Sequence, residues 1–340
     1  MHREYPPPPT AEAGAETLNP HEEHPDVRIP LDEEIERLVA VAAAAGQPPL
    51  SELTPEDARE WSRRTCVAPD PPRGVASVRT DSVPGGEDDL EVRIYHPAPG
   101  ERRPLLVHFH GGGWVLGGLE EADETCRRIA CEADVAVVSV DYRLAPENPY
   151  PAAIEDAAAA TRHVLMEHDR FGAEPERIGV SGDSAGGHLA AVTALGLRKA
   201  RTIPPLALQY LIYPVTDCDF GRASMISNAH GRLLETEGMR WFWNHFCPDA
   251  ERRLEWTASP IRTPSLEGTA PAIVALAAHD PLFSEGLAYA RRLEEAGVTT
   301  SVRIARDLIH GFFSLTAASE RADQETGTLN RLAGALLRHG

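Results

Sequence analysis

The sequence is almost without lysine: Lys199 is the only one among 340 residues, so nearly all positive charge comes from arginine. Basic residues are also outnumbered, because 52 aspartates and glutamates face 33 lysines and arginines and leave a net charge of −19. Binding to a nucleic-acid backbone requires clustered arginine and lysine. The charge balance therefore argues against nucleic acid as a partner, while acidity by itself favours solubility and specifies no substrate.

Cysteine and long apolar runs are scarce as well. The five cysteines are scattered, odd in number and without a CxxC pair, which gives neither a disulfide framework nor a metal site and is typical of a reducing compartment. No run approaches the ~18 apolar residues that a membrane span requires. The start of the chain lacks the apolar segment of a secretory signal. We therefore expect a soluble, cytoplasmic protein that contains no metal and does not bind a membrane.

Residues 1–30 are rich in proline, alanine, glutamate and histidine, lack periodicity and are predicted to form a flexible arm. The histidines His21 and His24 within it do not have the spacing of the HExxH zinc pattern. Two amphipathic helices are expected next, one over 31–45 and one that has Thr54 as its N-cap and Pro55 as its first helical residue. Both precede any predicted strand.

From residue 75 onward, predicted strands alternate with predicted helices. The strands are apolar, β-branched runs at 75–80, 90–97, 105–110, 135–142, 177–182, 206–214, 272–280 and 300–308. A turn-rich connector between the first two suggests a hairpin, and most later strands are separated by helical segments at about 119–132, 151–168, 184–199 and 284–297. This alternation predicts an α/β protein whose mostly parallel sheet carries helices on both faces. The interval 217–260 breaks the alternation with an aromatic-rich helix at 238–246, in the place where a lid would lie.

The stretch G-D-S-A-G at 182–186 follows an apolar run and precedes an alanine-rich helix. A chain that turns sharply from strand to helix needs small residues two positions before and after the serine, and the turn lifts the hydroxyl above the sheet. We therefore predict Ser184 as a nucleophile; the alternative is an ordinary glycine-rich turn. We expect Asp183 to have a structural role and to accept hydrogen bonds from neighbouring loops, because successive residues of such a turn point apart.

A serine nucleophile needs a base, and the base needs an orienting acid. Asp280 ends one predicted strand and His310 follows the next, so both should lie at the carboxyl edge of the sheet, in the chain order serine, acid, histidine. Other candidates are less well placed. His188 lies one turn along the nucleophile's helix, His279 should face away from Asp280, and Glu285, which could replace Asp280, lies within the next helix.

Three consecutive glycines at 111–113 directly follow another predicted strand. Backbone N–H groups can turn inward there without obstruction, so we predict Gly111 and Gly112 as oxyanion donors together with the N–H of Ala185. His110 is expected to brace this loop by hydrogen bonding. The GxGxxG and GxxxxGK[ST] patterns of nucleotide-binding loops are absent, which argues against a nucleotide, and the chemistry requires no cofactor.

Over about residues 50–335 the sequence resembles the hormone-sensitive-lipase-like branch of the α/β-hydrolases, also called bacterial family IV esterases. The resemblance rests on motifs in the right order: HGGGW (110–114), SVDYRLAPENPYPAA (139–153), GDSAGGHLA (182–190), LIYP (211–214), HDPL (279–282) and HGF (310–312). It implies an α/β-hydrolase fold with an eight-stranded catalytic core at 73–216 and 261–340. It also implies a cap made of the helices in 31–72 and the insertion 217–260.

The resemblance further implies hydrolysis of carboxylic esters, with short to medium acyl chains favoured. An amide, a lactone or an acetyl group on a secondary metabolite stays an open alternative, because the same triad accepts each. Some receptors of this fold bind ligand without hydrolysing it, but they lack the triad histidine, which is present here as His310. Members are often dimers, so a homodimer is also open.

The resemblance has departures and leaves some roles undecided. His188 stands where the family usually has asparagine, and His279 and Ser284 alter the surroundings of the acid. Tyr142, Arg143, Glu147 and Asp156 are expected to form scaffold beneath the active-site edge. Aromatic side chains in and before the insertion either line a substrate pocket or pack the cap on the core; the pocket candidates are Trp114, Trp241 and Phe242.

Overall fold

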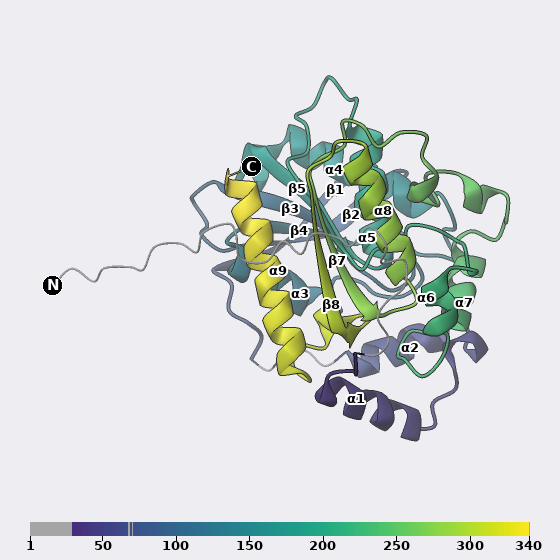
Figure 1. Ribbon diagram of the computed structural model, residues 1–340. Helices are drawn as coiled ribbons and strands as arrows, with labels where there is room; N and C mark the ends of the chain where they lie inside the picture. Colours follow the sequence, from purple (N-terminus) through teal and green to yellow (C-terminus); the bar gives the residue numbers. More distant parts are fainter. Residues whose placement is uncertain (1–28, 67–68, 70, 340) are drawn as a thin grey trace.

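The computed structural model describes residues 29–66, 69 and 71–339. Its strands form one eight-stranded sheet in the order β1-β2-β4-β3-β5-β6-β7-β8 (Figure 1). Their bounds are β1 (Ser77–Pro84), β2 (Asp89–His96), β3 (Arg103–Phe109), β4 (Ala136–Val140), β5 (Ala173–Asp183), β6 (Gln209–Ile212), β7 (Ala272–His279) and β8 (Thr300–Ile309). The predicted arm lies outside the described residues, except for its last two positions, and so does the pair His21 and His24.

The pairing confirms the mostly parallel sheet. All pairs from β4 through β3, β5, β6 and β7 to β8 are parallel, whereas β1 pairs antiparallel with β2 and β2 antiparallel with β4. The first two strands are therefore the hairpin that the turn-rich connector suggests. Because β5, β7 and β8 run in the same direction, the residues that follow them emerge at the same edge of the sheet.

Two apolar cores lie on opposite faces of the sheet, because successive strand residues face opposite sides. In β3, Leu105 and Val107 belong to one core and Leu106 to the other. The first core is covered by α4 (Ala152–Met166), α5 (Ala185–Leu197) and α8 (Phe283–Glu295), and the second by α3 (Asp123–Ala133) and α9 (Glu320–His339) (Figure 1). Burial of both faces explains why the strands read as nearly continuous apolar runs.

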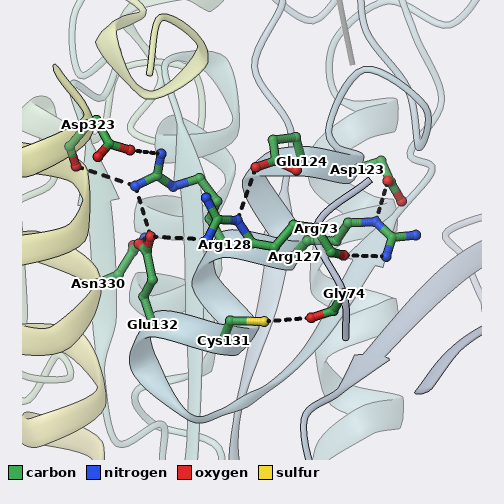
Figure 2. A network of polar contacts seen from close by, with 10 residues as sticks. All are labelled: Arg73, Gly74, Asp123, Glu124, Arg127, Arg128, Cys131, Glu132, Asp323 and Asn330. Atoms are coloured by element: carbon green, nitrogen blue, oxygen red, sulfur yellow. Dashed lines mark hydrogen bonds and ion pairs between the residues drawn. The ribbon is translucent and has the colours of Figure 1, made fainter. Parts of the chain in front are cut away.

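Helix α9 is absent from the elements that the sequence predicts, and polar contacts hold it against α3 (Figure 2). Arg128 of α3 pairs with Asp323 of α9 and with Glu132 of its own helix. Asn330 of α9 donates to Glu132 at 2.8 Å. The Arg128 side chain is only 4% exposed, so its charge is buried and needs both carboxylates. These contacts fix the last helix of the chain on the second core.

The helices before β1 and those within the insertion lie at one end of the molecule (Figure 1). They are α1 (Glu33–Ala44), α2 (Pro55–Thr65), α6 (Ala223–Ser227) and α7 (Thr236–Phe246). As predicted, Thr54 caps α2, since its hydroxyl accepts from the Asp57 N–H, and Pro55 opens the helix. The indole N–H of Trp241 in α7 donates to the carbonyl of Leu53 at 3.2 Å. The N-terminal segment and the insertion are thus in direct contact.

None of the helices in the described part of the chain is both long and apolar enough to cross a membrane.

Candidate active site

Three side chains from distant parts of the chain meet at the carboxyl edge of the sheet. Ser184 follows β5, Asp280 follows β7 and His310 follows β8. The Ser184 Oγ lies 2.9 Å from His310 Nε2, and His310 Nδ1 lies 2.7 Å from Asp280 Oδ2. The residues that the sequence predicts as nucleophile, acid and base are therefore brought together in one hydrogen-bonded chain.

Ser184 sits in a strained turn. Its φ of 55° and ψ of −116° lie in a region that costs a non-glycine residue about 1–3 kcal/mol. The flanking glycines make the turn possible: a Cβ on Gly186 would lie 1.9 Å from the Phe109 carbonyl oxygen, and one on Gly182 would lie 2.3 Å from Gly186. The Ser184 N–H donates to the carbonyl of Ile212 at 2.9 Å. Only glycine fits at both flanks, which is consistent with the small residues that the sequence pattern requires there.

The contacts of Asp280 set the protonation pattern of the histidine. The Asp280 carboxylate is almost fully buried and accepts from the Leu282 N–H at 2.8 Å with its other oxygen. A carboxylate accepts, so His310 Nδ1 carries the proton and Nε2 presents a lone pair to the Ser184 hydroxyl. This arrangement suits removal of a proton from the serine.

Two supporting residues escape the sequence analysis. Asn228, in the insertion, donates to the Asp280 carbonyl at 3.2 Å. The ring of Tyr213 packs at 4.6 Å from the His310 ring, and its backbone has an unusual φ of 33°. Tyr213 lies in the LIYP motif, which is a signal that could have drawn attention to it. Asn228 carries no such signal.

The rival acid and base candidates are engaged elsewhere. Glu285 is fully buried in α8 and accepts from the N–H groups of Thr216 and Asp217, and burial raises its pKa well above the ordinary value. His279 Nε2 lies 3.0 Å from the Ile29 carbonyl, away from Asp280. His188 also touches neither Ser184 Oγ nor Asp280 through any hydrogen bond recorded between described residues.

One predicted oxyanion donor is wrong. The N–H of Gly111 donates to Asp183 Oδ1 at 2.9 Å, so it is not available to an oxyanion. The amides of Gly112, Gly113 and Ala185 have no acceptor among the described residues. Gly113, the third glycine of the run, is thus a donor candidate that the sequence analysis omits. Asp183 has the structural role expected for it, because it accepts from the neighbouring loop.

Two histidines lie near Asp183 and the start of the glycine loop. Burial raises the pKa of Asp183 to about 6, against the lowering effects of His310 and the Gly111 N–H. His108 Nε2 lies 3.8 Å away, but burial lowers the pKa of His108 to about 3, so this ring is neutral. His110 Nδ1 lies 2.7 Å from the Gly111 carbonyl, which confirms that His110 braces the loop.

The residues predicted as scaffold form polar contacts between segments, and the Tyr142 hydroxyl donates to the His110 carbonyl at 2.8 Å. Asp156 is fully buried and accepts from the backbone N–H of Gly86 and from the guanidinium and backbone of Arg143. Arg59 of α2 forms a bidentate ion pair with Glu147. Arg59 also donates to the carbonyls of Val115 and Ala145, both at 2.8 Å. This arginine connects the N-terminal helices to the glycine loop, residues 110–118, which contains Val115. The sequence analysis does not single out this arginine.

The pocket candidates differ in their surroundings. Trp114 is fully buried and stacks on Phe246 at 4.0 Å, so for this residue the packing alternative holds. Trp241 is bonded to the Leu53 carbonyl and is 9% exposed, which also fits packing. Phe242 differs, because a Cβ on Gly113 would lie 2.1 Å from its ring. Phe242 therefore packs directly against Gly113 of the glycine loop.

Comparisons with known proteins identify the family of this chain. A family model described as the alpha/beta hydrolase fold matches residues 106–314. Carboxylic ester hydrolase LipN of Mycobacterium tuberculosis is 43% identical over 76% of this chain and 70% of its own length. The ethyl acetate hydrolase of Pseudomonas putida is 34% identical over 85% of this chain and 92% of its own. The solved structure of a thermostable esterase from Pseudomonas putida superposes with a TM-score of 0.86 at 32% identity, covering 91% of this chain and 98% of that one.

The chain therefore belongs to the α/β-hydrolase family. Within it, the chain is a member of the hormone-sensitive-lipase-like branch, the bacterial family IV esterases, and several of the relatives it matches are named as carboxylic ester hydrolases or esterases. Both the fold class and the family resemblance predicted from the motifs are confirmed.

Proposed function

We propose that Ser184, His310 and Asp280 form the catalytic triad of this carboxylic ester hydrolase, and that it cleaves short- to medium-chain acyl esters through an acyl-enzyme. The observation that carries the proposal is the continuous hydrogen-bonded chain from the serine oxygen through the imidazole to the buried carboxylate. The name of one relative, an ethyl acetate hydrolase, supports a short acyl chain.

The reaction proceeds in two transfers. His310 Nε2 takes the proton of the Ser184 hydroxyl as the oxygen attacks the ester carbonyl carbon, and the carbonyl electron pair moves onto its oxygen. When the tetrahedral species collapses, the alcohol leaves with the proton from His310 Nε2. Water then attacks the acyl-serine by the same route and releases the acid. Asp280 keeps the Nδ1 proton in place and stabilises the imidazolium.

The proposed oxyanion donors are the backbone N–H groups of Gly112, Gly113 and Ala185. Their support is that each amide lacks an acceptor among the described residues and that Ala185 opens the 13-residue helix α5. The positive end of a helix dipole favours developing negative charge there. In comparable sites the loss of one such donor lowers turnover by about 10²–10³.

The direct test is Ser184→Ala together with labelling by a fluorophosphonate. We expect the wild-type protein to hydrolyse p-nitrophenyl butyrate and to be labelled, and the variant to do neither while its unfolding curve stays unchanged. Near-wild-type turnover of the variant would refute the triad. Absence of labelling in the wild type would favour a ligand-binding protein over an enzyme.

The bond that is cleaved in the cell is a separate question. A series of p-nitrophenyl acetate, butyrate, octanoate and laurate, extended to lactones and anilides, measures acyl-chain preference and bond type together. We expect the highest kcat/KM for acetate or butyrate. A higher value for a lactone or an anilide would support the alternative activities that the same triad permits.

The cytoplasmic location and the homodimer stay predictions. All five cysteines are free in the structure, which supports a reducing compartment. Fractionation of the producing cells and light scattering of the purified protein test the two predictions.

A further inference from the structure

We propose that His188 is a positioning residue for the oxyanion hole: its imidazole holds the glycine loop, residues 110–118, at a fixed distance from the nucleophile helix by accepting a hydrogen bond from the indole of Trp114. The proposal rests on the function proposed above. It goes beyond that function by assigning a role in the reaction to a residue that lies outside the proposed triad.

Two hydrogen bonds define the state of this ring. The indole Nε1–H of Trp114 points at His188 Nδ1 at 3.1 Å, and His188 Nε2 lies 3.0 Å from the carbonyl of Thr257. A carbonyl only accepts, so Nε2 carries the proton, and Nδ1 is left with a lone pair for the indole. His188 is fully buried, and burial lowers its pKa to about 4. The ring is therefore neutral at neutral pH and keeps Nδ1 as an acceptor.

The loop needs such an anchor because its backbone is strained. Gly112, Gly113 and Trp114 have successive φ values of 110°, 59° and 61°. Glycine adopts these values freely, but tryptophan does not, and a strained residue keeps its conformation only where its surroundings enforce it. The carbonyl of Trp114 accepts from the Ala145 N–H at 2.9 Å, which fixes the backbone on one side. The indole bond to His188 fixes the side chain.

The hydrogen bond between Trp114 and His188 affects the positions of all three proposed oxyanion donors. Two of the proposed donors, Gly112 and Gly113, directly precede Trp114, so a rotation of the tryptophan moves both amides. The third, Ala185, opens the helix that carries His188, and the N–H of His188 donates to the Ser184 carbonyl at 3.0 Å. One side-chain bond therefore joins the two halves of the oxyanion hole and sets the spacing between their donors.

Packing alone leaves this spacing less defined. Trp114 stacks on Phe246 with an interplanar angle of 11°, and Trp243 and His188 meet it edge-on with ring centroids at 5.1 and 5.3 Å. A stacked ring can slide along its neighbour at little cost, whereas a hydrogen bond is directional. The hydroxyl of Tyr150 is hydrogen-bonded to the hydroxyl of Thr257, a residue near the end of the insertion.

Two substitutions of similar shape test the two hydrogen bonds of His188, to Trp114 and to Thr257, one at a time. In His188→Asn, the amide oxygen takes the place of Nδ1 and can accept from the indole, but the side chain is too short for the Thr257 carbonyl. In His188→Gln, the amide nitrogen reaches the position of Nε2 and can donate to Thr257, but no acceptor stays beside the indole. The first variant tests the loop bond by keeping it, and the second by removing it.

We expect His188→Gln to lower kcat for p-nitrophenyl butyrate by about tenfold to a hundredfold, with KM changed less than about twofold, because displaced donors weaken only the transition state. His188→Asn should stay within about threefold of the wild type. Affinity for a trifluoromethyl ketone, whose serine adduct carries an oxyanion, should fall in parallel with kcat/KM. A structural role alone would lower the unfolding temperature of both variants and leave kcat of the folded protein unchanged.

Trp114→Phe provides the second variant and the coupling test. It removes the indole N–H and keeps a ring, so we expect its kcat to fall like that of His188→Gln, and the double variant to be no slower than either single one. Additive losses, or a His188→Asn variant as slow as His188→Gln, would overturn the proposal. The indole proton signal of Trp114, assigned by its loss in Trp114→Phe, should shift in His188→Gln and stay in His188→Asn.

The two proposals fail in different ways. If Ser184 is not the nucleophile, the wild-type protein escapes labelling by the fluorophosphonate. If His188 does not hold the loop, the wild type is labelled and active, and His188→Gln has the same kcat and the same Trp114 indole signal.

Discussion

Asp183 is a carboxyl group next to Ser184 in the sequence that does not belong to the proposed triad. It accepts from the Gly111 N–H and faces a neutral His108. This single contact decides which amides of the glycine run stay free for a substrate. The Gly111 N–H is bonded to Asp183. A Cβ on residue 111 would lie 2.3 Å from the Asp183 carboxylate, so only glycine fits at this position.

The raised pKa of Asp183 makes a pH-dependent prediction. Since its pKa is about 6 in the folded protein and 3.8 ordinarily, the stability it contributes is complete below about pH 4 and is lost as the pH rises through about 6. The full effect is at most about 3 kcal/mol. Asp183→Asn keeps an acceptor for Gly111 and removes the titration. We expect its free energy of urea unfolding to fall less than that of the wild type between about pH 5 and about pH 7.5.

Glu147→Gln is the control for this measurement. The ion pair with Arg59 lowers the pKa of Glu147 to about 2, below the tested range, so the variant should keep the wild-type pH dependence. Identical pH dependence in Asp183→Asn and the wild type would contradict the assignment of the raised pKa to Asp183.

Phe242 is the residue for which a substrate contact is best supported. Its ring lies against Gly113, one of the proposed oxyanion donors. We expect Phe242→Ala to open space beside the loop and to shift the preference among p-nitrophenyl esters from butyrate toward octanoate. Trp241→Phe, which alters a neighbouring ring bonded to the Leu53 carbonyl, should leave the preference unchanged. Equal chain-length profiles for both variants and the wild type would remove Phe242 from the pocket.

At the scale of elements, α2 is tied to the active-site loop by one arginine. Arg59 is 22% exposed and reaches two carbonyls and Glu147 at once, whereas Glu147 is 58% exposed. We expect Arg59→Ala to lower the free energy of unfolding by about 2 kcal/mol, because two buried carbonyls lose their donor. Glu147→Gln should lower it by less than about 1 kcal/mol, since an exposed ion pair contributes little. Urea unfolding of both variants measures the difference, and equal losses would show that only the ion pair matters.

The strands and most helices could be predicted because each buries a regular apolar pattern. Helix α9 escaped prediction because Gly327 and Gly334 interrupt its sequence, and glycine disfavours helices. The reason for Gly334 is visible only in three dimensions: a Cβ there would lie 2.1 Å from the Ala133 carbonyl oxygen of α3. The glycine permits close approach of two helices that are far apart in the sequence.

In the candidate active site, too, some residues could be predicted from the sequence and others could not. Ser184, Asp280 and His310 could be predicted because strand ends and chain order place them. The choice among Gly111, Gly112 and Gly113 could not, because it depends on a carboxylate 72 residues away. The contact of His188 with Trp114 spans 74 residues and was likewise beyond any local pattern.

At the scale of the whole molecule, the sheet separates two apolar cores, one on each of its faces. The core beneath α4, α5 and α8 includes Trp114 of the glycine loop, whereas the core beneath α3 and α9 includes Tyr213, whose ring packs against His310. Polar contacts join α3 to α9 (Figure 2). Close packing transmits strain to neighbouring residues, but substitutions at sites that share no contact usually act independently. A substitution at the contact between α3 and α9 should therefore lower the free energy of unfolding more than it lowers turnover.

Arg128 provides the test on the face opposite α5. Arg128→Met keeps the apolar stem but removes the buried cation from between Asp323 and Glu132. Asp323 is 49% exposed and Glu132 keeps its bond from Asn330, so we expect the free energy of unfolding to fall by about 2 kcal/mol. Because α3 and α9 contact no triad residue through a recorded hydrogen bond among the described residues, kcat/KM of the folded variant should stay within about twofold of the wild type. His188→Gln should give the opposite result, with turnover reduced more than stability. A loss of turnover in Arg128→Met measured well below its unfolding temperature would show that the two faces are coupled.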